Sequence, residues 1–123
     1  MNTKKKIIIA EDNQDLLWLL VGKLTKEGYE VLGMPDGVNI VEGHCALPDI
    51  FILDKDMDYI DGESITRYLR HCPDSEKVPI LMLSGSNSSK SAKAAGVNFY
   101  FEKPFKMSEV INTIELTLGK KEG

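Results

Sequence analysis

Five short runs of apolar residues set the pattern of the chain. Residues 50–53 and 80–83 are apolar without interruption, and residues 7–10 are a β-branched run that ends in alanine. Runs of this kind are typical of strands that are buried on both faces, as in a parallel sheet. Residues 29–32 and 98–101 are the two remaining predicted strands. The first of these is weaker, and we expect it near an edge of the sheet.

Segments with helical spacing alternate with these runs. After the first strand, apolar residues recur on one helical face: Leu16, Leu17, Leu20 and Leu24. Asn13 is the predicted N-cap of this helix and Gly28 its end, and Trp18 falls outside the apolar face. Further helices are predicted over residues 38–42, 62–70, 86–95 and 107–118. The last five residues, 119–123, are expected to form a loose tail.

Five strands that alternate with five helices over short connections predict one fold class. Right-handed crossovers then give a parallel sheet with helices on both faces, an α/β architecture. The chain has 123 residues and contains no repeat, linker or low-complexity segment. We therefore expect a single domain over residues 1–123, without an output domain.

Composition and charge exclude several classes of function. The net charge is −4, and the only basic stretch is residues 4–6, which argues against nucleic acid as a direct ligand. No apolar run is long enough to span a membrane and no leader pattern is present, so we expect a cytoplasmic protein. Cys45 and Cys72 lack metal-site spacing and are interpreted as reduced thiols.

Polar side chains follow four of the predicted strands at their carboxyl ends. Glu11 and Asp12 follow the first strand, and Asp54 follows the third. Ser84 follows the fourth strand, and Lys103 lies just beyond the fifth. The carboxyl ends of parallel strands meet at one edge of a sheet, where open α/β folds bind their ligands. We therefore expect these five side chains to converge.

The chemistry of this set points to phosphoryl transfer. Carboxylates in one place repel one another unless a cation lies among them, and carboxylate oxygens favour Mg²⁺. Lys103 adds a compact positive charge for a phosphate oxygen, and Ser84 adds a hydroxyl donor. Surrounded by these groups, Asp54 can act as a nucleophile and form an aspartyl-phosphate.

The same residues carry a resemblance to a known family. The matching segments, in chain order, are residues 10–13, 48–54, 57, 61–62, 83–85 and 103–105. Over essentially its whole length the chain resembles the receiver domain of bacterial two-component response regulators. The resemblance implies a flavodoxin-like, doubly wound (βα)5 fold with five parallel strands in the order 2-1-3-4-5.

The resemblance also implies a role for each site residue. Asp54 would accept a phosphoryl group from a sensor histidine kinase or a phosphotransfer protein. Ser84 and Lys103 would contact the phosphoryl oxygens. Mg²⁺ would be held by Glu11, Asp12, Asp54 and the backbone carbonyl of Asp56. Such a domain is a phosphoacceptor with self-catalysed phosphotransfer and slow autodephosphorylation, rather than an enzyme.

A conformational switch is implied as well. Tyr100 stands at the family's aromatic switch position, three residues before Lys103. On phosphorylation, Ser84 and Tyr100 would move inward and remodel the face formed by the fourth helix, fifth strand and fifth helix. An unidentified downstream protein would read this face. The peptide between Lys103 and Pro104 is expected to be cis.

The sequence departs from the family pattern in several places. Asp58 stands where proline is usual, and Gly85 replaces a common alanine. The segments of the second and fourth helices are each a few residues short. Phe99 is interpreted as an additional exposed aromatic residue that could mark a contact surface. Trp18 is expected to report poorly on Asp54, because it lies on the first helix.

Other readings of the same residues stay open at this point. A haloacid-dehalogenase-like phosphatase also places two aspartates after a strand, here Asp54 as nucleophile and Asp56 as acid–base. That family has its aspartates on the first strand and needs a late acidic pair. Another alternative is a binding module that works without phosphorylation.

Overall fold

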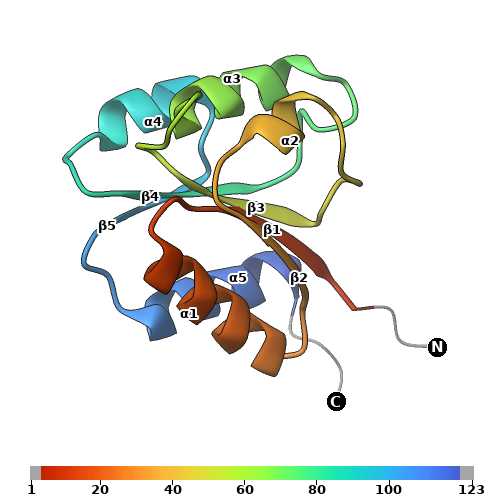
Figure 1. Ribbon diagram of the computed structural model, residues 1–123, viewed down its shortest axis with the longest axis vertical. Helices are drawn as coiled ribbons and strands as arrows, with labels where there is room; N and C mark the ends of the chain where they lie inside the picture. Colours follow the sequence, from red (N-terminus) through yellow and green to blue (C-terminus); the bar gives the residue numbers. More distant parts are fainter. Residues whose placement is uncertain (1–3, 120–123) are drawn as a thin grey trace.

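The computed structural model describes residues 4–119, which form the predicted α/β architecture (Figure 1). The predicted loose tail therefore lies, apart from Gly119, outside the described residues. One parallel sheet has the strand order β2-β1-β3-β4-β5, as predicted. Its strands are β1 (Lys6–Ala10), β2 (Glu30–Met34), β3 (Ile50–Asp54), β4 (Ile80–Ser84) and β5 (Phe99–Glu102).

Helices cover both faces of this sheet (Figure 1). The helices α1 (Gln14–Lys26) and α5 (Met107–Leu118) lie on one face. On the other face lie α2 (Val38–Val41), α3 (Gly62–His71) and α4 (Ser89–Ala95). The fold is thus doubly wound, and none of the described helices is long and apolar enough to cross a membrane.

The core consists of two clusters, one on each face of the sheet. Every residue of β3 and β4 is buried, which explains why their sequences show no polar alternation. Ile7 and Ile9 of β1 face the α1–α5 side, while Ile8 faces α2, α3 and α4. The continuous apolar runs therefore supply both clusters and fix the positions of the strand ends.

Helix boundaries follow from local chemistry. The side chain of Asn13 accepts a hydrogen bond from the N–H of Leu16 at 3.0 Å, which confirms it as the N-cap of α1. Asp61 caps α3 in the same way, through the N–H of Ser64 at 2.8 Å. Gly96 ends α4 with a φ of 115°, in the left-handed region that glycine adopts without strain.

Several details of the sequence interpretation were wrong. Strand β2 begins and ends later than residues 29–32, because the N–H of Tyr29 donates to the carbonyl of Leu24 in α1 and pairing with β1 begins at Glu30. Helix α4 begins at Ser89 rather than residue 86. Phe99 is partly buried and packs against the α1–α5 cluster, so it is not the fully exposed aromatic residue that the sequence suggested.

Candidate functional site

Asp54 ends the central strand β3 and is almost fully buried, with 3% of its surface exposed. The register pairs Ala10 with Leu53, so Glu11 and Asp54 each follow this last pair. The buried apolar residues on both sides of β3 hold the backbone at this point. The Asp54 carboxylate is therefore fixed at a rigid strand end.

The loop after Asp54 returns close to the strand. The N–H of Gly62 donates to the carbonyl of Lys55 at 2.8 Å. A Cβ atom at residue 62 would collide with the backbone carbonyl oxygen of Asp54. Glycine is therefore needed here for a close approach of two backbone segments, which places the start of α3 directly beside the acid.

Lys103 brings the positive charge into the acidic cluster. Its Nζ lies 3.3 Å from Asp54 Oδ1 and 3.2 Å from both carboxylate oxygens of Glu11. The cis peptide between Lys103 and Pro104 is present, as predicted, and the N–H of Lys103 donates to the Ser84 carbonyl at 2.7 Å. Burial lowers the pKa of Lys103, but the charges of Glu11 and Asp54 outweigh it and raise the pKa overall. The ammonium is therefore held in its charged form.

The acids strongly perturb one another. Burial first, and then the hydrogen bond and charge of Glu11, raise the pKa of Asp54 from 3.8 to about 8, against the opposing charge of Lys103. Glu11 is fully buried, and its Oε1 has no hydrogen-bond partner although Lys103 Nζ lies 3.2 Å away, because the contact lacks hydrogen-bond alignment. One lysine is insufficient for this much buried negative charge.

A hard divalent cation fits this arrangement. Ligand oxygens of Glu11, Asp12 and Asp54 all lie within 4.8 Å of one another. Such a set of carboxylates is the donor set that Mg²⁺ prefers, and a cation there would satisfy the unpartnered Glu11 oxygen. Asp12 is exposed, so the cluster has an open side toward solvent.

Ser84 and Tyr100 are joined through one backbone carbonyl. The Ser84 hydroxyl, fully buried, donates to the carbonyl of Ser86 at 3.0 Å. The Tyr100 hydroxyl donates to the same carbonyl and accepts from the N–H of Ser88 at 2.8 Å. Sequence reasoning missed Ser86 and Ser88 as partners of Tyr100, because both bonds use backbone groups and depend on the path of the loop.

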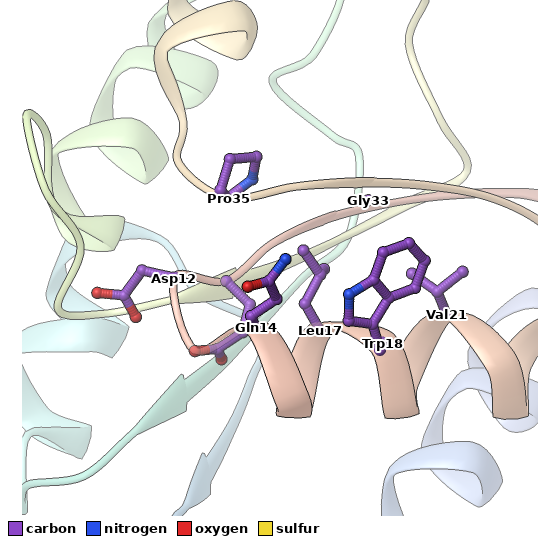
Figure 2. A pocket seen from close by; sticks show the side chains of 8 residues that line it. Asp12, Gln14, Leu17, Trp18, Val21, Gly33 and Pro35 are labelled. Atoms are coloured by element: carbon purple, nitrogen blue, oxygen red, sulfur yellow. The ribbon is translucent and has the colours of Figure 1, made fainter.

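The end of β4 lies beside the end of β3, because Asp54 pairs with Leu83. Asp56 is exposed, and its N–H lies 3.4 Å from Asp54 Oδ1. Its carbonyl as a metal ligand stays a prediction. Trp18 lies on α1 and lines a groove together with Glu11 and Asp12 (Figure 2). That it reports poorly on Asp54 stays a prediction.

Fold and geometry together define a class: doubly wound domains in which a strand-end aspartate lies among acids, a hydroxyl and a lysine. The chain belongs to the response regulator receiver domain family, which matches residues 7–115. It is 33% identical over 119 residues to the phosphate regulon transcriptional regulatory protein PhoB of Rhizobium meliloti (strain 1021), covering 94% of this chain and 52% of PhoB. The chain thus spans about half the length of the curated relatives it matches.

Solved structures agree with this assignment. A protein of Chloroflexus aurantiacus J-10-fl assigned as a response regulator has a TM-score of 0.87 at 30% identity, over 94% of this chain and 98% of that one. The receiver domain of a sensor histidine kinase of Pseudomonas aeruginosa PAO1 has a TM-score of 0.84 at 28% identity, over 95% and 99% of the two chains. That structure holds a magnesium ion in its active-site cleft.

These findings confirm the family and the fold that the sequence predicts. The haloacid-dehalogenase-like alternative is not favoured, because the family match covers nearly the whole chain and is not to an enzyme family.

Proposed function

We propose that Asp54 is the phosphoacceptor of this receiver domain. The observation that carries the proposal is the convergence of Lys103 on Asp54 and Glu11, at 3.2–3.3 Å, around a carboxyl buried at a strand end. In the transfer, an Asp54 oxygen forms a bond to phosphorus while the P–N bond of a phosphohistidine breaks. The departing imidazole nitrogen keeps the electron pair and takes a proton from water.

The chain's own residues prepare this step. Lys103 lies where it can neutralise one phosphoryl oxygen once Asp54 carries the phosphate. Ser84 offers a hydroxyl that can turn from the Ser86 carbonyl to another phosphoryl oxygen. Burial by the neighbouring strands keeps Asp54 poorly solvated, which strengthens each of these electrostatic contacts.

Glu11, Asp12 and Asp54 are the side chains proposed to hold Mg²⁺, with the Asp56 carbonyl as a further ligand. When bound, the ion supplies positive charge that lowers the raised pKa of Asp54 and neutralises charge on the transferring phosphoryl group. This role explains why three acids are held within 4.8 Å of one another with a single lysine.

The shared carbonyl of Ser86 suggests how phosphorylation reaches the surface. If the Ser84 hydroxyl turns to the phosphoryl group, Tyr100 becomes the sole hydroxyl donor to that carbonyl. The loop before α4 would then tighten around Tyr100, which also accepts from Ser88. We propose that this changes the α4–β5–α5 face, which a downstream protein reads.

Other parts of the proposed function rest on the family and on charge. The phosphodonor is a sensor histidine kinase or a phosphotransfer protein, and the aspartyl-phosphate is lost by slow autodephosphorylation. The net charge of −4 supports contact of this domain with protein rather than nucleic acid. A cytoplasmic location stays a prediction.

The proposal is tested by incubation with a small phosphodonor and Mg²⁺, followed by intact mass measurement. Wild type should gain one phosphoryl group, and Asp54→Asn should gain none. Asp56→Asn is the matched control, because it removes a carboxylate two residues away on the same loop and should still be labelled. Labelling of Asp54→Asn equal to wild type would contradict the assignment.

A further inference from the structure

Tyr59 lies in the loop between β3 and α3 (Figure 1), and 86% of its surface is exposed. The loop starts directly after Asp54 and returns to the same strand end, where the N–H of Gly62 donates to the Lys55 carbonyl at 2.8 Å. Tyr59 is three residues before Gly62, so the two Cα atoms are at most about 11 Å apart. The aromatic ring therefore belongs to the surface around the buried acceptor carboxylate, although it has no part in the proposed phosphotransfer.

The backbone at Tyr59 is strained. Its φ is 74°, and no other described residue apart from glycine has a positive φ. The N–H of Ile60 donates to the carbonyl of Asp58 at 2.9 Å, which closes a γ-turn with Tyr59 at its centre. A γ-turn with positive φ is rare, because the Cβ atom of an L-residue is crowded there. Glycine would form the same turn without this strain.

The fold makes little use of the Tyr59 ring. On either side of it, Met57 and Ile60 pack against the core cluster beneath α2, α3 and α4, and Asp61 caps α3 through the N–H of Ser64. These contacts fix the loop and would hold the turn equally well with glycine at its centre. Strained residues cluster at functional and ligand-binding positions. A strained tyrosine with its ring in solvent thus points to a contact outside the chain.

The residue before Tyr59 adds an uncompensated charge. Asp58 is exposed, and no basic side chain within residues 4–119 forms an ion pair with it, whereas Lys55 Nζ lies 3.7 Å from the carboxylate of Asp56. The carboxylate of Asp58 is also outside the acidic metal cluster. A guanidinium group is planar and charged, so it can lie on an aromatic ring and pair with a carboxylate at once. Asp58 and Tyr59 together therefore fit an arginine side chain.

We infer that Asp58 and Tyr59 bind an arginine of the protein that donates the phosphoryl group. Asp54 is only 3% exposed, so a donor histidine reaches its oxygen only when the donor's surface is pressed against the loops at this strand end. The loop of residues 55–61 is one of these loops, and an arginine near the donor histidine would lie on Tyr59 and pair with Asp58. The inference rests on the proposed function of Asp54 and defines the chemistry of its partner.

Three phosphodonors test this recognition. The first is a peptide with arginine on both sides of a phosphohistidine, the second is the same peptide with neutral citrulline in place of arginine, and the third is phosphoramidate. The rate of Asp54 labelling with Mg²⁺ at low ionic strength is measured by intact mass. Wild type should react about fivefold faster with the arginine peptide than with the citrulline peptide. This ratio should shrink at high salt.

Two pairs of variants localise the effect. Asp58→Asn should bring the ratio close to one, whereas Asp74→Asn, which removes an exposed acid near the starts of β3 and β4, should leave it unchanged. Tyr59→Gly should lower the ratio, and Tyr59→Phe, which retains the ring, should preserve it. Tyr59→Gly should also unfold at a higher denaturant concentration than wild type, because glycine relieves the strained turn. If Tyr59→Gly fails to fold, the aspartate pair decides.

The inference is overturned if wild type reacts equally fast with both peptides, or if both variants of a pair change the ratio alike. A Tyr59→Gly protein that folds but is no more stable than wild type would contradict the strain argument. Phosphoramidate separates these failures from that of the proposed function. Labelling of Asp54 by phosphoramidate without a preference between the peptides removes only this inference, while no labelling of wild type by any donor removes the proposed function.

Discussion

Arg70 and Lys103 are both basic side chains that join separate elements, but they differ in what they leave unsatisfied. Arg70 lies at the opposite end of the strands from Asp54, and its Nε donates to the Gly96 carbonyl at 2.9 Å. Its other donors reach the carbonyls of Ser75, Glu76 and Val78 and the side chain of Asn98. Asn98 Oδ1 also accepts from the N–H of Ile80 at 2.8 Å. This cluster contains its own acceptors.

The Lys103 cluster, in contrast, leaves buried acidic groups without enough hydrogen-bond donors. Two acids converge on one ammonium, the Glu11 Oε1 atom has no hydrogen-bond partner, and the pKa of Asp54 is raised to about 8, first by burial. Buried polar groups are normally satisfied within the chain. The difference teaches that Arg70 holds elements together, whereas the acids around Lys103 are arranged for a ligand.

The largest expected effect on stability comes from removing the guanidinium of Arg70. Arg70→Met should lower the free energy of unfolding by roughly 2–4 kcal/mol, because several acceptors in the segments just before β4 and between α4 and β5 lose their donor. Chemical denaturation measures this loss. Arg67→Met is the matched control on α3, where the guanidinium makes one exposed hydrogen bond to Ser64 Oγ at 3.2 Å. A control as unstable as Arg70→Met would contradict the structural role of Arg70.

The Lys103 cluster, unlike the Arg70 cluster, should gain stability from a bound Mg²⁺ ion. At a concentration one hundredfold above its dissociation constant, Mg²⁺ should stabilise wild type by about 2.7 kcal/mol, because it binds the folded state alone. Thermal unfolding with and without Mg²⁺ measures this shift. Asp12→Asn should lose most of it, and Asp15→Asn, three residues along at the start of α1, should keep it. A similar shift in both variants would place the ion elsewhere.

Removing a charge from the acidic cluster should stabilise the metal-free protein. Burial and Glu11 raise the pKa of Asp54 from 3.8 to about 8, so the folded state holds a proton that the unfolded chain releases between these values. The stabilisation from this proton is complete below pH 3.8 and is lost as the pH rises through about 8.

Stability without metal should therefore decline across that range in wild type but not in Asp54→Asn. Above pH 8 the variant should be the more stable protein by on the order of 1–2 kcal/mol. Denaturation curves at a series of pH values measure both effects. Parallel pH profiles for the two proteins would show that Asp54 carries no raised pKa.

The smallest expected effect concerns the loop before α4. Tyr100→Phe removes the hydroxyl that bridges the Ser86 carbonyl and the Ser88 N–H, and should cost about 0.5–1.5 kcal/mol. Hydrogen exchange should rise at residues 86–88, while phosphodonor labelling of Asp54 continues. Tyr59→Phe is the control, because Tyr59 is 86% exposed. Unchanged exchange in Tyr100→Phe would argue against the proposed coupling through Ser86.

Much of this site could be predicted from sequence, because the end of a buried strand can be read directly from the point where an apolar run meets a polar residue. The apolar run that ends at Asp54 fixes both the strand and the position of the carboxylate, and Glu11 follows β1 in the same way. The partners of Tyr100 could not be predicted, since they are backbone groups of a loop. The groove at Trp18 was equally hidden, because it depends on Gly33 and α1 being neighbours in space.

The most direct measurement is localisation of the phosphoryl group by borohydride trapping and peptide mass spectrometry. Reduction converts an aspartyl-phosphate to homoserine, so the acceptor is read at its position in the chain. We predict homoserine at residue 54 after treatment with a phosphodonor and Mg²⁺, and none when Mg²⁺ is chelated. Homoserine at residue 12 or 56 instead, or labelling at 54 that does not depend on a divalent ion, would contradict the central claim.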